Sequence, residues 1–189
     1  DFESVLAHAR RALETEPDGE LAGELHLLMS EAHLWRGEAE AREESARRAM
    51  ARFTRLSPRW YVAAAETARI ASRAGRHDEV ATLFEQVAAD DTPATAGARA
   101  VVLAQLCVPA LRAGQTELAA RIFDALGQTQ RHLSDDDHPG RGWLARAEGY
   151  AALVAGDAST YLEKTELAAR CFEAASEERH ALTFRTSVG

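Results

Sequence analysis

Residues 117–126 read ELAARIFDAL, and residues 166–175 read ELAARCFEAA, so the chain carries nearly the same ten residues twice. Seven of the ten positions are identical, and the two copies start 49 residues apart. Within each copy the apolar residues recur at spacings of three and four, which is typical of one face of an α-helix. The duplication predicts a helical element that is repeated along the chain.

Four glycines mark the repeat. They are separated by 38, 39 and 42 residues and are Gly37, Gly75, Gly114 and Gly156. Each follows an apolar helical pattern, and glycine takes the left-handed conformation that commonly ends a helix. Ser57-Pro58 and Thr92-Pro93 predict helix starts, with a hydroxyl at the N-cap and proline at the first helical position. No segment has the alternating pattern of a strand, so the sequence predicts helix pairs of about 40 residues each.

Similar types of residue also occur at fixed distances before and after these glycines. Small residues lie seven positions before them, namely Ser30, Ala68, Cys107 and Gly149. A residue pair lies five and nine positions after a glycine, as Val80 with Phe84 and Ala119 with Phe123. Ala168 and Phe172 match this pair if seven residues are inserted after Gly156. In the first repeat Ala46 fits, but Arg42 stands where a small residue is expected.

These positions resemble those of the tetratricopeptide-repeat family. The resemblance implies an all-α fold, a right-handed α-solenoid of antiparallel helix pairs with about nine helices. It also implies that Phe84, Phe123 and Phe172 are buried between neighbouring helices, with Phe123 the most important of the three.

We expect residues 1–189 to form one such array, cut from a longer chain. Residues 2–15 would be the second helix of a cut repeat, and residues 177–189, which end in Val188-Gly189, the first helix of another. The helix pairs between them are expected at 19–54, 58–90, 93–127 and 139–176, with a longer loop near 128–138.

Composition limits the function. The net charge of −8 argues against a general nucleic-acid binder, which needs a basic face. We find no basic-then-apolar leader and no apolar run near the roughly 18 residues of a membrane span, so we expect a cytoplasmic protein that contacts no membrane. Cys107 and Cys171 lie in apolar helical patterns, which favours buried, reduced thiols over a disulfide.

The usual catalytic motifs are absent from the sequence, so we expect no enzyme activity, cofactor or metal. His26 and His33 lie seven residues apart, about 10 Å along a helix, which favours packing over metal binding. The acidic run SDDDHPG at 134–140 lacks the ligand pattern of a calcium loop. It is expected to be a solvated loop in which one aspartate caps the helix that begins near Pro139.

The family resemblance also implies a partner-binding face, because first helices line the concave surface of such arrays. The inward positions carried over by the glycine count are Glu66, Arg69, Arg73, Gln105, Arg112, Trp143, Arg146 and Tyr150. Arginine beside aromatic residues is typical of interface hot spots. The alternative is that these arginines pair with local glutamates on a solvated face.

Two functions remain open. The first is an interaction scaffold whose concave face binds a protein or peptide, an acidic peptide or the parent chain's own catalytic domain. Residues 156–189 resemble repeat regions of large bacterial signalling proteins, where such arrays follow a serine/threonine kinase or a signalling ATPase. The second is a ligand-sensing helical domain of a bacterial transcription regulator. A kinase or ATPase beside this segment would favour the first function, and a helix-turn-helix the second.

Overall fold

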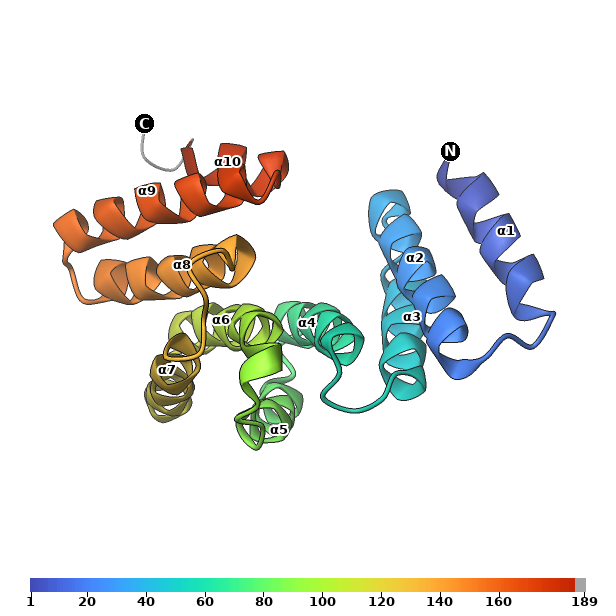
Figure 1. Cartoon of the computed structure of the whole chain (residues 1–189), viewed down its shortest axis with the longest axis horizontal. Helices are drawn as coiled ribbons and strands as arrows, with labels where there is room; N and C mark the ends of the chain where they lie inside the picture. Colours follow the sequence, from blue (N-terminus) through green and yellow to red (C-terminus); the bar gives the residue numbers. More distant parts are fainter. Residues whose placement is uncertain (186–189) are drawn as a thin grey trace. The chain divides into compact units, whose positions relative to one another are not determined.

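The computed structural model describes residues 1–185, apart from the side chain of Arg179. Every regular element in this range is helical, with ten α-helices and one short 3₁₀-helix (Figure 1). The all-helical prediction is confirmed over these residues, and the number of helices is ten rather than about nine. The helix predicted at 177–189 corresponds to α10, and residues 186–189 lie outside the described residues.

The chain divides into two compact units. Unit 1 is Asp1–Ile70 and unit 2 is Ala71–Gly189. Unit 1 contains α1 (Phe2–Leu13), α2 (Gly19–Arg36), α3 (Ala39–Arg52) and most of α4 (Pro58–Arg73). Unit 2 contains α5 (His77–Ala88), η1 (Pro93–Thr95), α6 (Ala96–Arg112), α7 (Thr116–Gln130), α8 (His138–Val154), α9 (Ala158–Ala174) and α10 (Glu178–Arg185). Each unit is described by itself.

Unit 1 is built by successive packing of neighbouring helices. Helix α2 packs against both α1 and α3. Leu6 and Ala9 of α1 meet Met29 and Ala32 of α2 in one buried cluster. Small alanines on α3 are completely buried, which lets the helices approach closely.

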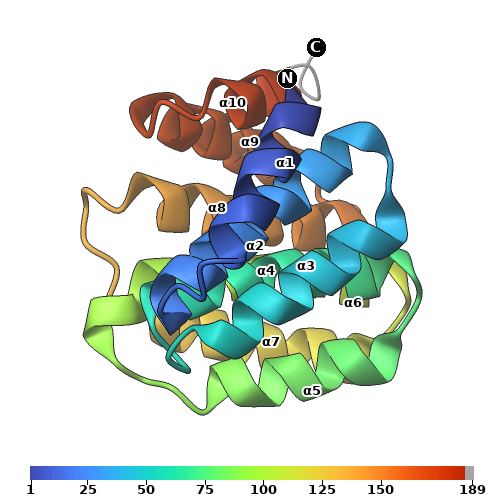
Figure 2. The same cartoon turned by 90° about the vertical axis from the view of Figure 1, so that its right-hand side faces the viewer.

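Unit 2 is organised around α6, which packs against α5, α7 and α8. Leu103, Leu106 and Cys107 of α6 are completely buried. Helix α8 packs in turn on α9, and α9 on α10, while α5 and α7 lie side by side (Figures 1 and 2). Both cysteines are free and buried, as expected, and burial raises the pKa of Cys107 to about 12.

The segment Pro93–Arg112 is long and apolar enough to cross a membrane by length and composition, but most of it is buried within the structure. The expectation that no apolar run approaches this length is therefore wrong, and six of the twenty residues of the run are alanine. Its burial is compatible with the core helix of a soluble protein.

The predicted helix stops are confirmed. Gly37, Gly75, Gly114 and Gly156 all have positive φ angles, between 69° and 81°. At Gly37, which ends α2, the N–H of Glu38 donates to the carbonyl oxygen of His33 at 3.0 Å. This contact satisfies a carbonyl that the end of the helix would leave without an internal partner.

One of the two predicted N-caps is confirmed. The hydroxyl of Ser57 accepts a hydrogen bond from the backbone N–H of Trp60 at 3.2 Å. Thr92 makes no such bond, because its hydroxyl donates instead to the Asp90 carboxylate at 2.5 Å. The chain after Thr92 accordingly forms a 3₁₀ turn, and α6 begins only at Ala96.

The prediction for the repeated phenylalanines is correct for two residues and wrong for the third. Phe84 is 2% exposed and Phe172 is completely buried. Phe123 is only partly buried. On α7 the buried positions are Ala119, Ile122, Leu126 and Thr129, which places Phe123 at the edge of the packed face. Both copies are helical and bury the equivalent positions Ala119 and Ala168, and Ile122 and Cys171, but only the second copy also buries its phenylalanine.

Two glycines allow a matched test of packing. A Cβ atom at Gly97 would collide with the carboxylate of Asp137, which caps α8 by accepting from the N–H of Gly140 at 3.0 Å. Gly127 on α7 has open space around its Cβ position. We expect Gly97→Ala to destabilise the protein by about 1–2 kcal/mol through loss of this cap. Gly127→Ala is expected to stabilise it by up to ~1 kcal/mol. Urea midpoints check both, and equal shifts of the same sign would contradict the contact with Asp137.

Candidate functional site

The eight predicted partner-binding residues fall into two groups. Glu66 and Arg69 belong to unit 1. The other six belong to unit 2, where Arg73 ends α4 and is exposed, Gln105 and Arg112 lie on α6, and Trp143, Arg146 and Tyr150 lie on α8.

In unit 1 the carboxylate of Glu66 is part of a buried ion pair. One of its oxygens accepts from both Nε and Nη2 of Arg42, each at 2.6 Å. Its other oxygen pairs with Arg69, one turn further along α4. The side chains of Arg42 and Glu66 are only 8% and 10% exposed. Burial lowers the pKa of the Arg42 guanidinium below its usual value.

This pair explains the departure of the first repeat from the small-residue pattern. Arg42 on α3 is accommodated because Glu66 supplies a counter-ion, and the hydroxyl of Ser30 on α2 donates to the Arg42 carbonyl oxygen at 3.2 Å. Three helices of unit 1 are thereby joined by polar contacts. The carboxylate of Glu66 is engaged inside the unit, so Glu66 stabilises the unit whether or not it also contacts a partner.

In unit 2 the predicted residues share helix faces. Gln105 and Arg112 are seven residues apart on α6, which puts them on one face of that helix. Trp143, Arg146 and Tyr150 follow the same rule on α8, with spacings of three and four. Helices α6 and α8 pack together.

Arg146 lies over two aromatic rings. Its guanidinium carbon is 5.0 Å from the ring centroid of Trp143 and 5.4 Å from that of Phe184 on α10. Burial, and then the positive charge of Arg112, lower the pKa of Arg146 below its usual value. Over residues 1–185, neither Arg112 nor Arg146 forms an ion pair. The two arginines therefore provide positive charge that no carboxylate of the described chain neutralises.

Trp143 is packed rather than exposed. Its ring meets Phe172 edge to face at 5.7 Å and His180 of α10 at 5.3 Å. Phe184 stacks on Phe172 at 5.4 Å. The sequence did not indicate that α10 supplies His180 and Phe184 to this cluster, although its helical pattern predicted the helix itself. Trp143 thus holds Arg146 in place and offers little surface of its own.

The side chain of Gln105 includes an oxygen that has no hydrogen-bond partner among the described residues. This oxygen is buried. An unpaired buried acceptor is costly. Because this oxygen has almost no accessible surface, it belongs to the packing around α6 and is not a contact that a ligand can reach.

The other polar residues singled out in the sequence have structural roles. His26 and His33 are both buried, and Nδ1 of His33 is 2.5 Å from a carboxylate oxygen of Glu38. Burial is the main cause that lowers the pKa of His26. In the acidic loop Asp137 caps α8, as expected. No group of three His, Cys, Asp or Glu side chains in residues 1–185 is placed to hold a metal ion.

No family model matches the chain, and neither a curated protein nor a solved structure matches it. The resemblance to tetratricopeptide repeats therefore rests on the glycine-counted positions themselves.

Proposed function

We propose that this chain is an interaction module that binds an acidic peptide segment or partner domain. The observation that carries the proposal is the uncompensated pair Arg112 and Arg146 in a chain whose net charge is −8. An acidic ligand would be repelled by most of the surface and attracted to this place. Complementary charge of this kind chiefly determines where a partner binds and how fast.

The chemistry of the two arginines suits carboxylates. A guanidinium group offers a planar fork of N–H donors that matches a carboxylate with two parallel hydrogen bonds. Contacts with the rings of Trp143 and Phe184 restrict the Arg146 side chain, which reduces the conformational entropy lost on binding. Arg73 of unit 2 remains proposed as a further contact, and Arg69, which pairs with Glu66, is proposed as a contact of unit 1 by itself.

In this proposal the helix pairs are those of a tetratricopeptide-like solenoid, and within unit 2 the bound segment runs along the first helices α6 and α8. The module would be the regulatory part of a bacterial signalling protein, and its partner could be a separate protein or a catalytic domain of the parent chain. The glycine-terminated helix pairs support the repeat, and the resemblance of residues 156–189 supports the signalling context.

The test uses defined peptides. Fluorescence anisotropy would compare a labelled peptide of alternating glutamate and leucine with the same peptide carrying glutamine in place of glutamate. We expect Arg112→Glu and Arg146→Glu to weaken binding of the acidic peptide at least tenfold each, and Arg69→Glu to weaken it less. Binding should also weaken as salt rises, because the Debye length falls from about 10 Å at 0.1 M to about 3 Å at 1 M.

Arg170→Glu is the matched control, because Arg170 is an exposed arginine on α9 whose ion pair is a long one, 3.8 Å, with Glu166. It should leave the affinity within about twofold. An equal loss in all four variants, or equal binding of the glutamine peptide, would mean that general charge rather than this site holds the ligand. Unchanged binding in all four would place the partner-binding surface elsewhere.

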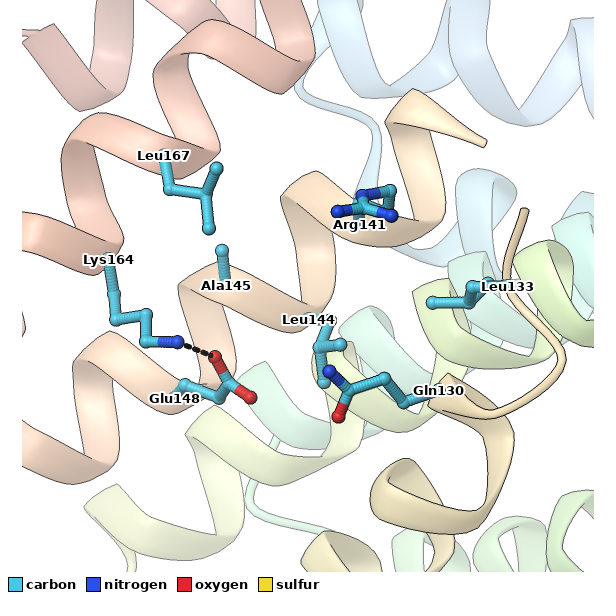
Figure 3. A pocket seen from close by; sticks show the side chains of 8 residues that line it. All are labelled: Gln130, Leu133, Arg141, Leu144, Ala145, Glu148, Lys164 and Leu167. Carbon is cyan, nitrogen blue, oxygen red and sulfur yellow. Dashed lines mark ion pairs between the residues drawn. The ribbon is translucent and has the colours of Figure 1, made fainter. Parts of the chain in front are cut away.

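The second candidate, a ligand-sensing domain of a transcription regulator, requires a cavity among the helices. Unit 2 contains one between α7, α8 and α9 (Figure 3). A helix-turn-helix in the parent protein, together with binding of a small molecule, would favour this function.

A further inference from the structure

The cavity in unit 2 has a volume of about 170 Å³ and is formed by the end of α7 and by facing positions of α8 and α9. Its apolar walls include Leu133, Leu144 and Leu167. Its polar residues include Arg141 and Glu148 of α8 and Lys164 of α9. Figure 3 shows Arg141 toward one end and the Glu148–Lys164 pair toward the other, with Leu144 and Leu167 between them.

This cavity is separate from the proposed partner-binding residues. Arg141, Leu144 and Glu148 are spaced by three and four residues and therefore share one face of α8. At 100° per residue, Trp143, Arg146 and Tyr150 fall on the opposite face of the same helix. A ligand in the cavity would not compete directly with a peptide bound at Arg146.

The charges in the cavity leave one positive charge in excess. Nζ of Lys164 pairs with a carboxylate oxygen of Glu148 at 2.7 Å, so these two charges cancel. Arg141 pairs with Asp135 at 2.7 Å, but the side chain of Asp135 is 98% exposed, so water screens that contact. A guanidinium group has five N–H donors, and this single contact leaves others free for a ligand.

The size of the cavity limits the ligand. At about 30 Å³ per water molecule, the space holds roughly six water-sized groups. The ligand must also carry an apolar chain, because the stretch between the two polar ends is walled by leucine side chains. A single negative charge at one end of a short aliphatic chain fits both requirements.

We propose that this cavity binds a short-chain aliphatic carboxylate of about four to six carbon atoms. Its carboxylate would bind Arg141, and its chain would lie against Leu144 and Leu167. The Glu148–Lys164 ion pair lies toward the far end, where its charges would disfavour a longer aliphatic chain.

The test is a titration followed by ¹H–¹⁵N spectra of the protein, with sodium pentanoate as the probe. Three compounds serve as controls. Sodium acetate has the negative charge but no aliphatic chain, and n-butylammonium chloride has the chain but a positive charge. Sodium octanoate has the negative charge and a chain that is too long for the cavity. At constant ionic strength, only pentanoate should cause saturable shifts, and these should be confined to the end of α7 and to α8 and α9.

Two variants and one control test the site itself. Arg141→Gln should weaken pentanoate binding at least tenfold, since it removes the carboxylate partner. Gln130 lies at the exposed edge of the cavity. In Gln130→Trp the larger indole ring should fill the cavity and abolish pentanoate binding, although Arg141 is unchanged. Arg170→Gln, outside the cavity, should change nothing. Gln130→Trp decides the matter if Arg141→Gln does not fold.

The proposal is overturned if pentanoate causes no saturable shifts, if acetate causes the same shifts, or if Gln130→Trp binds pentanoate unchanged. Because these measurements do not involve the acidic peptide, they test the cavity independently of the partner-binding proposal.

Discussion

Replacing Phe172 by alanine is expected to lower the free energy of unfolding by ~3–5 kcal/mol, the usual range for a fully buried phenylalanine. Phe172 has no exposed surface and contacts Trp143, His180 and Phe184. Removing its ring would leave a cavity among three aromatic neighbours from α8 and α10. These neighbours cannot close the space without leaving their edge-to-face and stacked positions.

Phe123→Ala provides the comparison. Phe123 and Phe172 occupy the same position in the two copies of the repeated ten residues, yet Phe123 is only partly buried. We expect its substitution to cost ~1–2 kcal/mol, because less apolar surface returns to water. Urea midpoints followed by far-ultraviolet circular dichroism measure both losses, and near-ultraviolet dichroism should show loss of the ordered Trp143 signal in the Phe172 variant alone. A larger loss for Phe123→Ala would show that the buried face of α7 is misassigned.

The helices were predictable from local sequence because their signals are local. Each of the four glycines ends a helix through its own left-handed conformation, whatever packs nearby. Asp137 could likewise be predicted as a cap, since an N-cap needs only the N–H groups of the next turn. These features do not depend on how the chain folds over longer distances.

The side-chain environment was less predictable because it depends on residues far apart in the sequence. Ten nearly identical residues bury Phe172 but leave Phe123 at the edge, since the neighbours of α9 include α10 and those of α7 do not. The same limit applies to Arg146. Its position on α8 was predicted, but its contact with Phe184, 38 residues later, was not.

Arg42 and Glu66 illustrate a signal that the sequence contained and that could have been used. A large cation at a position that otherwise holds small residues requires a counter-ion if it is buried. Glu66 was instead assigned to the partner-binding face because of its place on a first helix. Their contact spans 24 residues and brings both charges into the interior of unit 1.

Breaking this pair is expected to be among the most damaging changes to the protein. Glu66→Ala would leave Arg42 buried without a carboxylate, and Arg42→Ala would leave Glu66 with Arg69 as its ion-pair partner and the Ser30 hydroxyl as a weak donor. Removing one partner of a buried ion pair typically costs about 3–5 kcal/mol, because the remaining charge stays desolvated. We therefore expect either single variant to shift the urea midpoint of unit 1 strongly downward.

The double variant Arg42→Met with Glu66→Leu should recover most of that loss. Hydrophobic side chains of similar volume often replace a buried ion pair at little or no cost, since both desolvation penalties disappear together. A double-mutant cycle on urea midpoints gives the coupling between the two residues. The exposed pair Arg48 and Glu44 on α3, at 2.7 Å, serves as the control and should show a coupling of only about 0.3–0.5 kcal/mol. A coupling for Arg42 and Glu66 as small as this would contradict their burial. If the double variant is stable and still binds the acidic peptide, Glu66 acts in the packing of unit 1 and the ligand is held by the arginines of unit 2.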